Sequence, residues 1–400
     1  MLAVARCGAT PVRLVSARRS QTSVNSTCCA TQRTDQCCPH FASCICPSGG
    51  TLPPEVATAN PMTRLYQRLS DFGLPRKYVR DVALPSWWDD AAATNPAGYA
   101  QALVVLSRHA GLELSSLRDD SATIRLNESV PHKFKKVRTA SADDVGVARA
   151  LATQVAKIVA LGVQRSSVKV PSAAEVRQAV LDSDRRWVDL DGLLDYCWGC
   201  GVPVVHVSAF PRGAKKMDGI AARVNGIPVI VVSKEAKFSS WLLFIVAHEL
   251  GHIACGHVEE NQALVDDNVD VDSIDTEEVQ ANAFALELIT GKPNTKIRLA
   301  PNQQWPNADS LAKTAQRYGQ QSRTDPGHVV LNYAHSMGTK FWPVAQAALK
   351  KLEPRGSATE LIRAKMAGRL NWEEIPEDES EFVMRMTGVD GGDSDADTVS

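Results

Sequence analysis

Apolar residues recur at helical spacing from residue 62 onward. Leu65 and Leu69 lie one turn apart on one helix face, and a longer repeat covers residues 141–165. That repeat consists of Val145, Ala148, Leu151, Val155 and Val159. We therefore expect a helical domain over residues 62–165.

A degenerate helix-turn-helix pattern lies inside this helical region. The helix that begins near Pro96 breaks at Gly111, and residues 112–117 can begin a second helix. Four basic residues that could contact phosphates follow: Lys133, Lys135, Lys136 and Arg138. Because most basic runs are solvated surface, DNA contact through 62–165 is the less favoured expectation.

Strand patterns replace the helical spacing beyond residue 200. A helix predicted over 173–198 is followed by three apolar stretches of strand length: 202–207, 219–224 and 227–232. The last two flank Asn225-Gly226, a dipeptide that strongly favours a two-residue hairpin turn. We therefore predict an α+β fold, with a small sheet in a second domain over 170–350.

A histidine motif follows the longest apolar stretch of the chain, residues 241–247. It reads His248-Glu249-Leu250-Gly251-His252, in a helix expected to be capped by Ser239 or Ser240. Residues four apart share a helix face, so both imidazoles can bind one metal ion, with Glu249 beside them. Two histidines and a glutamate on an all-apolar helix would be costly without such a partner. The motif therefore predicts a metallohydrolase, and zinc suits this ligand set.

A third ligand is expected downstream, where carboxylates are abundant. Most of them lie in an acidic loop over 259–278, in which Val271 stands where a calcium-binding loop needs glycine. A helix follows, opened by Asp275 or Thr276 and closed at Gly291. Glu278, one turn into this helix, can complete the site.

The two segments together resemble the ImmA/IrrE family of zinc metallo-endopeptidases. The similarity lies in HELGH followed by E-x-x-A-N-x-F-A and covers roughly residues 175–350. It implies a gluzincin-like site, packed against a small sheet, in which His248, His252 and Glu278 bind Zn²⁺ and Glu249 is the catalytic base. It also implies a regulatory protease that cleaves a protein such as a transcriptional repressor or an antitoxin partner.

Several further residues are candidates for roles around the metal. A tetrahedral oxyanion needs a hydrogen-bond donor, and the spacing does not choose among His328, Tyr333 and His335. His257 lies five residues past His252, one short of the metzincin spacing, so we expect it beside the ligands rather than on the metal. Asn282 is expected there as well, because it shares a helix face with Glu278.

Composition limits the partners and the compartment. The formal net charge of −1 gives no global attraction to nucleic acid, and the seven-residue apolar stretch is far shorter than a membrane span. Seven of the ten cysteines lie in the first 46 residues, which favours a reducing cytoplasm for the remainder. Cys197 and Cys200 are expected to be small residues at the end of a helix rather than a redox pair.

The two ends of the chain carry weak patterns. Residues 1–61 are expected to be disordered or to precede a true start at Met62. Residues 351–400 are expected to be a helix and then a disordered acidic tail, because ten acids between Glu373 and Asp397 face one Arg385. The alternative to a peptidase is a DNA- or protein-binding regulator whose zinc domain is catalytically silent.

Overall fold

The computed structural model describes residues 60–127, 132–134, 142–164, 169–214, 217–266, 269, 272–299, 307–354 and 357–389. The expectation for residues 1–59, most of the basic cluster (Lys135, Lys136 and Arg138) and the last part of the acidic segment lie outside these residues. The helices are α1 (Pro61–Asp71), α2 (Arg76–Tyr78), η1 (Val79–Ala83), η2 (Asp90–Thr94), α3 (Pro96–Ala110), α4 (Leu114–Arg118), α5 (Ala142–Val159), η3 (Ala160–Gly162), α6 (Ala173–Asp182), α7 (Leu190–Gly199), α8 (Ser239–Ala254), α9 (Thr276–Thr290), α10 (Ala308–Ser322), α11 (Pro326–Met337), η4 (Thr339–Phe341), α12 (Trp342–Leu352), α13 (Ala358–Arg369), η5 (Trp372–Glu374) and α14 (Glu377–Thr387).

The described residues form one mixed sheet in the order β1-β5-β3-β4-β2. Its strands are β1 (His132–Phe134), β2 (Val204–His206), β3 (Gly219–Val224), β4 (Ile227–Val232) and β5 (Gln262–Asp266). The predicted hairpin is confirmed: β3 and β4 pair antiparallel, and Asn225 and Gly226 turn with φ of 50° and 84°. The sequence pattern does not predict β1 or β5. β1 lies within the basic cluster and β5 within the acidic segment 259–278, and neither charged segment has the apolar pattern of a strand.

Both faces of the sheet are covered, so its strands are apolar at almost every position. Ile220 and Ala222 of β3 pack into a core with α5 and the N-terminal helices. Ala221, between them, faces the opposite core, to which α6, α7, α8 and α9 contribute. This alternation places helix α8 directly against β3 and β4, and it confirms the predicted α+β fold.

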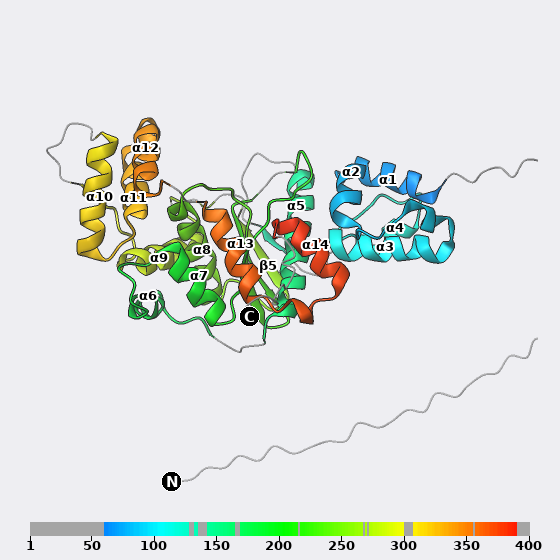
Figure 1. Cartoon of the computed structure of the whole chain (residues 1–400), viewed down its shortest axis with the longest axis horizontal. Helices are drawn as coiled ribbons and strands as arrows, with labels where there is room; N and C mark the ends of the chain where they lie inside the picture. Colours follow the sequence, from blue (N-terminus) through cyan, green and yellow to red (C-terminus); the bar gives the residue numbers. More distant parts are fainter. Residues whose placement is uncertain are drawn as a thin grey trace, which may run out of the picture. The chain divides into compact units, whose positions relative to one another are not determined.

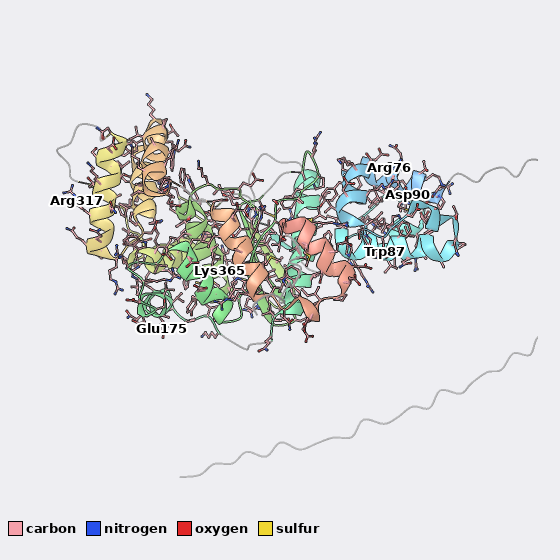
Figure 2. All side chains as sticks on the ribbon, in the orientation of Figure 1. Arg76, Trp87, Asp90, Glu175, Arg317 and Lys365 are labelled. Atoms are coloured by element: carbon pink, nitrogen blue, oxygen red, sulfur yellow. The ribbon has the colours of Figure 1, made fainter. Side chains whose placement is uncertain are left out.

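The N-terminal helices are held together partly by Asp90. Its carboxylate accepts a hydrogen bond from Tyr66 at 2.6 Å. It also pairs at 3.3 Å with Arg76, which is labelled near it in Figure 2. Helix α4, the second helix of the helix-turn-helix interpretation, has five residues, and that interpretation stays a prediction. The domain boundary near residue 165 stays a prediction.

The helix expected over 173–198 is two helices. α6 begins with a capping box formed by Ser172 and Glu175, and α7 begins at the N-cap Asp189. The polar cap at Asp189 thus divides a run that apolar spacing alone had joined. Cys197 and Cys200 lie at the C-terminal end of α7, the position that the sequence predicts.

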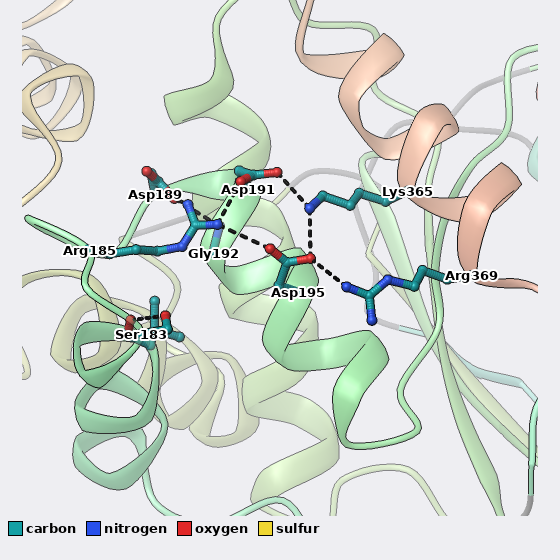
Figure 3. Close-up of polar contacts among 9 residues, drawn as sticks. Ser183, Arg185, Asp189, Asp191, Gly192, Asp195, Lys365 and Arg369 are labelled. Carbon is teal, nitrogen blue, oxygen red and sulfur yellow. Dashed lines mark hydrogen bonds and ion pairs between the residues drawn. The ribbon is translucent and has the colours of Figure 1, made fainter.

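Helix α13 lies beside α7 and the edge strand β2 (Figure 1). A charge network joins α13 to α7 (Figure 3). Arg185 donates to Asp189, Asp191 and Asp195, and from α13 Lys365 and Arg369 donate to Asp195 at 2.6 and 3.1 Å. Since these groups are partly exposed, each pair adds little stability, and the network mainly sets the position of α13.

The prediction of a disordered acidic tail is wrong for residues 377–387, which form α14. Three of its four acidic residues, Glu377, Asp378 and Glu379, lie in the first turn, where they suit the helix dipole. Phe382, Val383 and Met386 on its other face are buried, and Phe382 stacks on His109 of α3. Acidic composition had hidden this apolar face.

Helices α10, α11 and α12 pack side by side around a core of their own (Figure 1). Trp342 of α12 stacks on Trp241 of α8 with ring centroids 5.4 Å apart. The expected serine cap of α8 is wrong: the N-cap is Phe238, and the Ser239 amide donates to the Glu353 carboxylate at 2.8 Å. No helix of the described residues is long and apolar enough to cross a membrane.

Helices α8 and α9 approach each other most closely at Gly251. A β-carbon there would lie 3.0 Å from the Ala281 carbonyl oxygen and 3.1 Å from the Phe284 β-carbon. Ala281 and Ala285 of α9 are fully buried in this contact. The glycine and the two alanines therefore let α8 and α9 pack with their backbones close together.

We expect Gly251→Ala to destabilise the protein by about 1–3 kcal/mol, because the added methyl group must push α9 away. Gly368→Ala in α13 is the matched control, since a β-carbon there meets nothing within 4 Å. That change should be neutral or stabilising through helix propensity. Urea unfolding of the metal-free proteins measures both, and equal effects of the two substitutions would contradict the packing argument.

Candidate metal centre

The histidine motif occupies the buried C-terminal half of α8. His248, Glu249 and His252 have no solvent-exposed surface. Opposite them, α9 begins at Asp275, whose carboxylate accepts hydrogen bonds from the Glu277 and Glu278 amides at 3.0 and 3.3 Å. This cap fixes the first turn of α9 and so sets the position of the Glu278 side chain.

Three side chains converge between the two helices. The Nε2 atoms of His248 and His252 are 3.0 Å apart, and the Glu278 carboxylate oxygens lie 3.3 and 3.5 Å from them. Their ligand atoms all lie within 4.8 Å of one another. Two imidazole lone pairs and a carboxylate that face one another in a buried place fit a shared cation, so these residues can hold a metal ion.

Asn282 orients the first ligand. Its amide oxygen lies 3.0 Å from Nδ1 of His248, and the amide is almost fully buried. Because an amide oxygen only accepts, Nδ1 carries the proton and Nε2 keeps its lone pair for the metal. Asn282 lies where its helix spacing from Glu278 predicts.

His257 contacts the second ligand rather than the metal position. Its Nδ1 lies 2.8 Å from Nδ1 of His252, and its ring is buried beside that of His252. Its own Nε2 lies 2.8 Å from the Gln280 side-chain oxygen. No sequence pattern pointed to Gln280, although it is two residues from Glu278 on the helix already assigned to the site.

Gly219 accommodates the Glu249 carboxylate. A β-carbon at Gly219 would overlap Oε1 of Glu249, so any other residue at this start of β3 would require the Glu249 side chain to move. In the sequence, Gly219 is only the first residue of the apolar stretch 219–224 that predicts a strand. Its role depends on the contact between α8 and β3, which no local pattern shows.

The three candidate oxyanion donors lie in different surroundings. His328 is 3% exposed and stacks on Phe244 at 5.9 Å, and Phe244 in turn lies 6.4 Å from the ring of His248. Tyr333 packs on Phe341 in the core of α10, α11 and α12. His335 is partly exposed and pairs with Asp272 at 3.5 Å. Thus His328 is the candidate that shares a neighbour with a metal ligand.

Burial lowers the pKa of His328 to about 4, so its imidazole is neutral at pH 7. Neither ring nitrogen has a hydrogen-bond partner among the residues that the structure describes. A neutral imidazole still has one N–H to donate.

The fold and the metal-binding triad together define a metallopeptidase domain. Residues 203–321 match the model of the IrrE N-terminal-like domain, and this match includes α8, α9 and all three ligands. The chain therefore contains a peptidase domain of the ImmA/IrrE family, which confirms the resemblance seen in the sequence. Neither the curated proteins nor the solved structures include one that matches the chain.

His328 should make stability depend on pH. Its pKa is about 4 in the folded protein and about 6.5 when unfolded, so the unfolded chain binds the proton first. Stability present above pH 6.5 is therefore lost as the pH falls toward 4, by on the order of 3 kcal/mol. His328→Phe keeps the stacking surface and removes this dependence. Unfolding both metal-free proteins at pH 7.5 and 4.5 measures it, and parallel changes would contradict the prediction.

Proposed function

We propose that residues 203–321 form a zinc-dependent endopeptidase that hydrolyses a peptide bond in a protein substrate, with Glu249 as general base. The observation that carries this proposal is the position of Glu249. Its carboxylate is fully buried, follows the ligand His248 directly, and occupies space that Gly219 leaves open. A carboxylate has no structural need for such a place, because burying one is costly.

Zinc is the metal that we propose for this site. Two imidazoles and one carboxylate are a ligand set of catalytic zinc sites, which keep a further position open. Zinc supplies a Lewis acid that acidifies water and polarises the scissile carbonyl. His248, His252 and Glu278 would hold it, with Asn282 and His257 fixing the tautomers of the two histidines.

The side chains of Glu249 and His328 then have two tasks: one transfers the proton of the attacking water, and the other stabilises the oxyanion. Glu249 accepts the proton of the attacking water and delivers it to the leaving amine. We assign the oxyanion hydrogen bond to His328, because it is neutral, buried and adjacent to Phe244 on the ligand-bearing helix. Tyr333 and His335 are less suited, since their contacts lie with Phe341 and Asp272.

The substrate class is a protein, as for a peptidase of this family. Resemblance to regulatory members supports a repressor or antitoxin partner and a cytoplasmic site of action. An extended substrate peptide is not expected to add a strand beside β2, since α13 packs against that strand. A catalytically silent regulator remains the competing function, and the experiment below separates the two.

Glu249→Gln should retain the metal and lose cleavage by about 10²–10⁴-fold, because it preserves the three ligands and removes the base. Metal stoichiometry of the purified variant measures the first effect. Comparison of new protein N-termini in cells with the wild type and with the variant measures the second and identifies the substrate. Glu287→Gln, on the half-buried outer side of α9, is the control.

Two results would reject the proposal. Cleavage by Glu249→Gln at the wild-type rate would remove Glu249 as base. Identical N-termini with wild type, variant and no protein, despite full metal occupancy, would favour the silent regulator.

A further inference from the structure

A row of three polar side chains leads from the metal centre to the protein surface. Nδ1 of His252 lies 2.8 Å from Nδ1 of His257, and Nε2 of His257 lies 2.8 Å from Oε1 of Gln280. His252 is fully buried, His257 is 6% exposed, and Gln280 is exposed. The row therefore connects a metal ligand with a residue that solvent can reach.

Metal binding determines the direction of both hydrogen bonds. If Nε2 of His252 offers its lone pair to the metal, its proton must sit on Nδ1, so Nδ1 of His257 accepts. The proton of neutral His257 then sits on Nε2 and is donated to Gln280. The reverse arrangement would place a proton on the His252 nitrogen that faces His248 and Glu278. Only the outward direction is compatible with a bound cation.

Gln280 lies at the edge of an open cavity of about 630 Å³. The cavity is formed where the end of α8 and the outer side of α9 meet the start of α6, and it is also lined by Cys255, Phe284 and Glu287. The side chain of Gln280 thus has solvent on one side and His257 on the other. An exposed glutamine in such a place contributes little to packing, and surface substitutions usually change stability by less than about 0.5 kcal/mol.

We infer that Gln280 is a positioning residue of the metal centre that acts through His257. By accepting a hydrogen bond from Nε2–H, Gln280 holds His257 in the tautomer and orientation that accept from His252. His252 in turn presents its lone pair to the metal. The inference rests on the metal triad and is independent of the cleavage reaction, because its readout is metal affinity.

Outer hydrogen-bond partners of metal-binding histidines typically change metal affinity by about 10–100-fold. Gln280 contacts His257 rather than the ligand His252 itself, so we expect its effect on metal affinity to be at the lower end of that range. Gln280→Leu keeps a helix-forming side chain of similar size and removes the acceptor. It should weaken zinc binding by about tenfold.

A double-mutant cycle tests whether the effect passes through His257. Zinc affinity of the full chain is measured by competition with a chromogenic chelator for the wild type, Gln280→Leu, His257→Asn and the double variant. The substitution His257→Asn supplies an amide oxygen that can accept from His252 without help from Gln280. Gln280→Leu should therefore lose its effect in that background. A second background, His257→Phe, removes the acceptor and should give the same loss of coupling.

Gln316→Leu is the matched control, an exposed glutamine on α10 that should leave zinc affinity unchanged. Denaturant unfolding of each metal-free variant shows whether the variant is folded. If one of the two His257 variants does not fold, the cycle is completed with the other. Wild-type affinity in Gln280→Leu would overturn the inference. An equal loss with and without His257 would also overturn it, since Gln280 would then act by another route. If neither the wild type nor any variant cleaves protein, that result contradicts the proposed peptidase function and leaves the inference about Gln280 to be decided by zinc affinity.

Discussion

The close packing of α8 on α9 is the contact on which the metal centre depends. His248 and His252 come from one helix and Glu278 from the other, so their separation is set by how near the two backbones lie. Gly251 makes that distance short, with Ala281 directly across the interface. The glycine inside the histidine motif is thus a packing residue, and the metal site is a consequence of helix geometry.

A second constraint is the control of proton positions around the ligands. A histidine binds metal only through an unprotonated nitrogen, so each ligand needs an acceptor on its other nitrogen. Asn282 provides that acceptor for His248, and His257 provides it for His252. Glu278 and Glu249 bring two buried carboxyl groups into the site. A divalent cation suits such surroundings, because a buried carboxylate is costly without a compensating charge.

The sheet links the site with the remainder of the described chain. Its two faces are buried by different sets of helices, and β3 contributes side chains to both cores. At the start of that strand, Gly219 lies against the Glu249 side chain. α5 and α14 cover the face away from α8, and the charge network of Arg185 and Lys365 sets α13 beside β2. These elements lie outside residues 203–321 and pack around the sheet whose strand β3 accommodates Glu249.

The sequence by itself determined the two histidines of the triad and the hairpin, because each follows from spacing along a short segment of the chain. His248 and His252 are one turn apart, and Asn225-Gly226 has the backbone freedom that a tight turn requires. Tertiary structure alone decided what depends on contact between elements: the place of Gly219 against Glu249, the hydrogen bond of Gln280, and the sheet partners of β5. Tertiary structure also decided that the acidic segment 377–387 forms α14, because this helix buries Phe382 against the core. Local patterns encode local geometry, whereas these contacts join residues far apart in the chain.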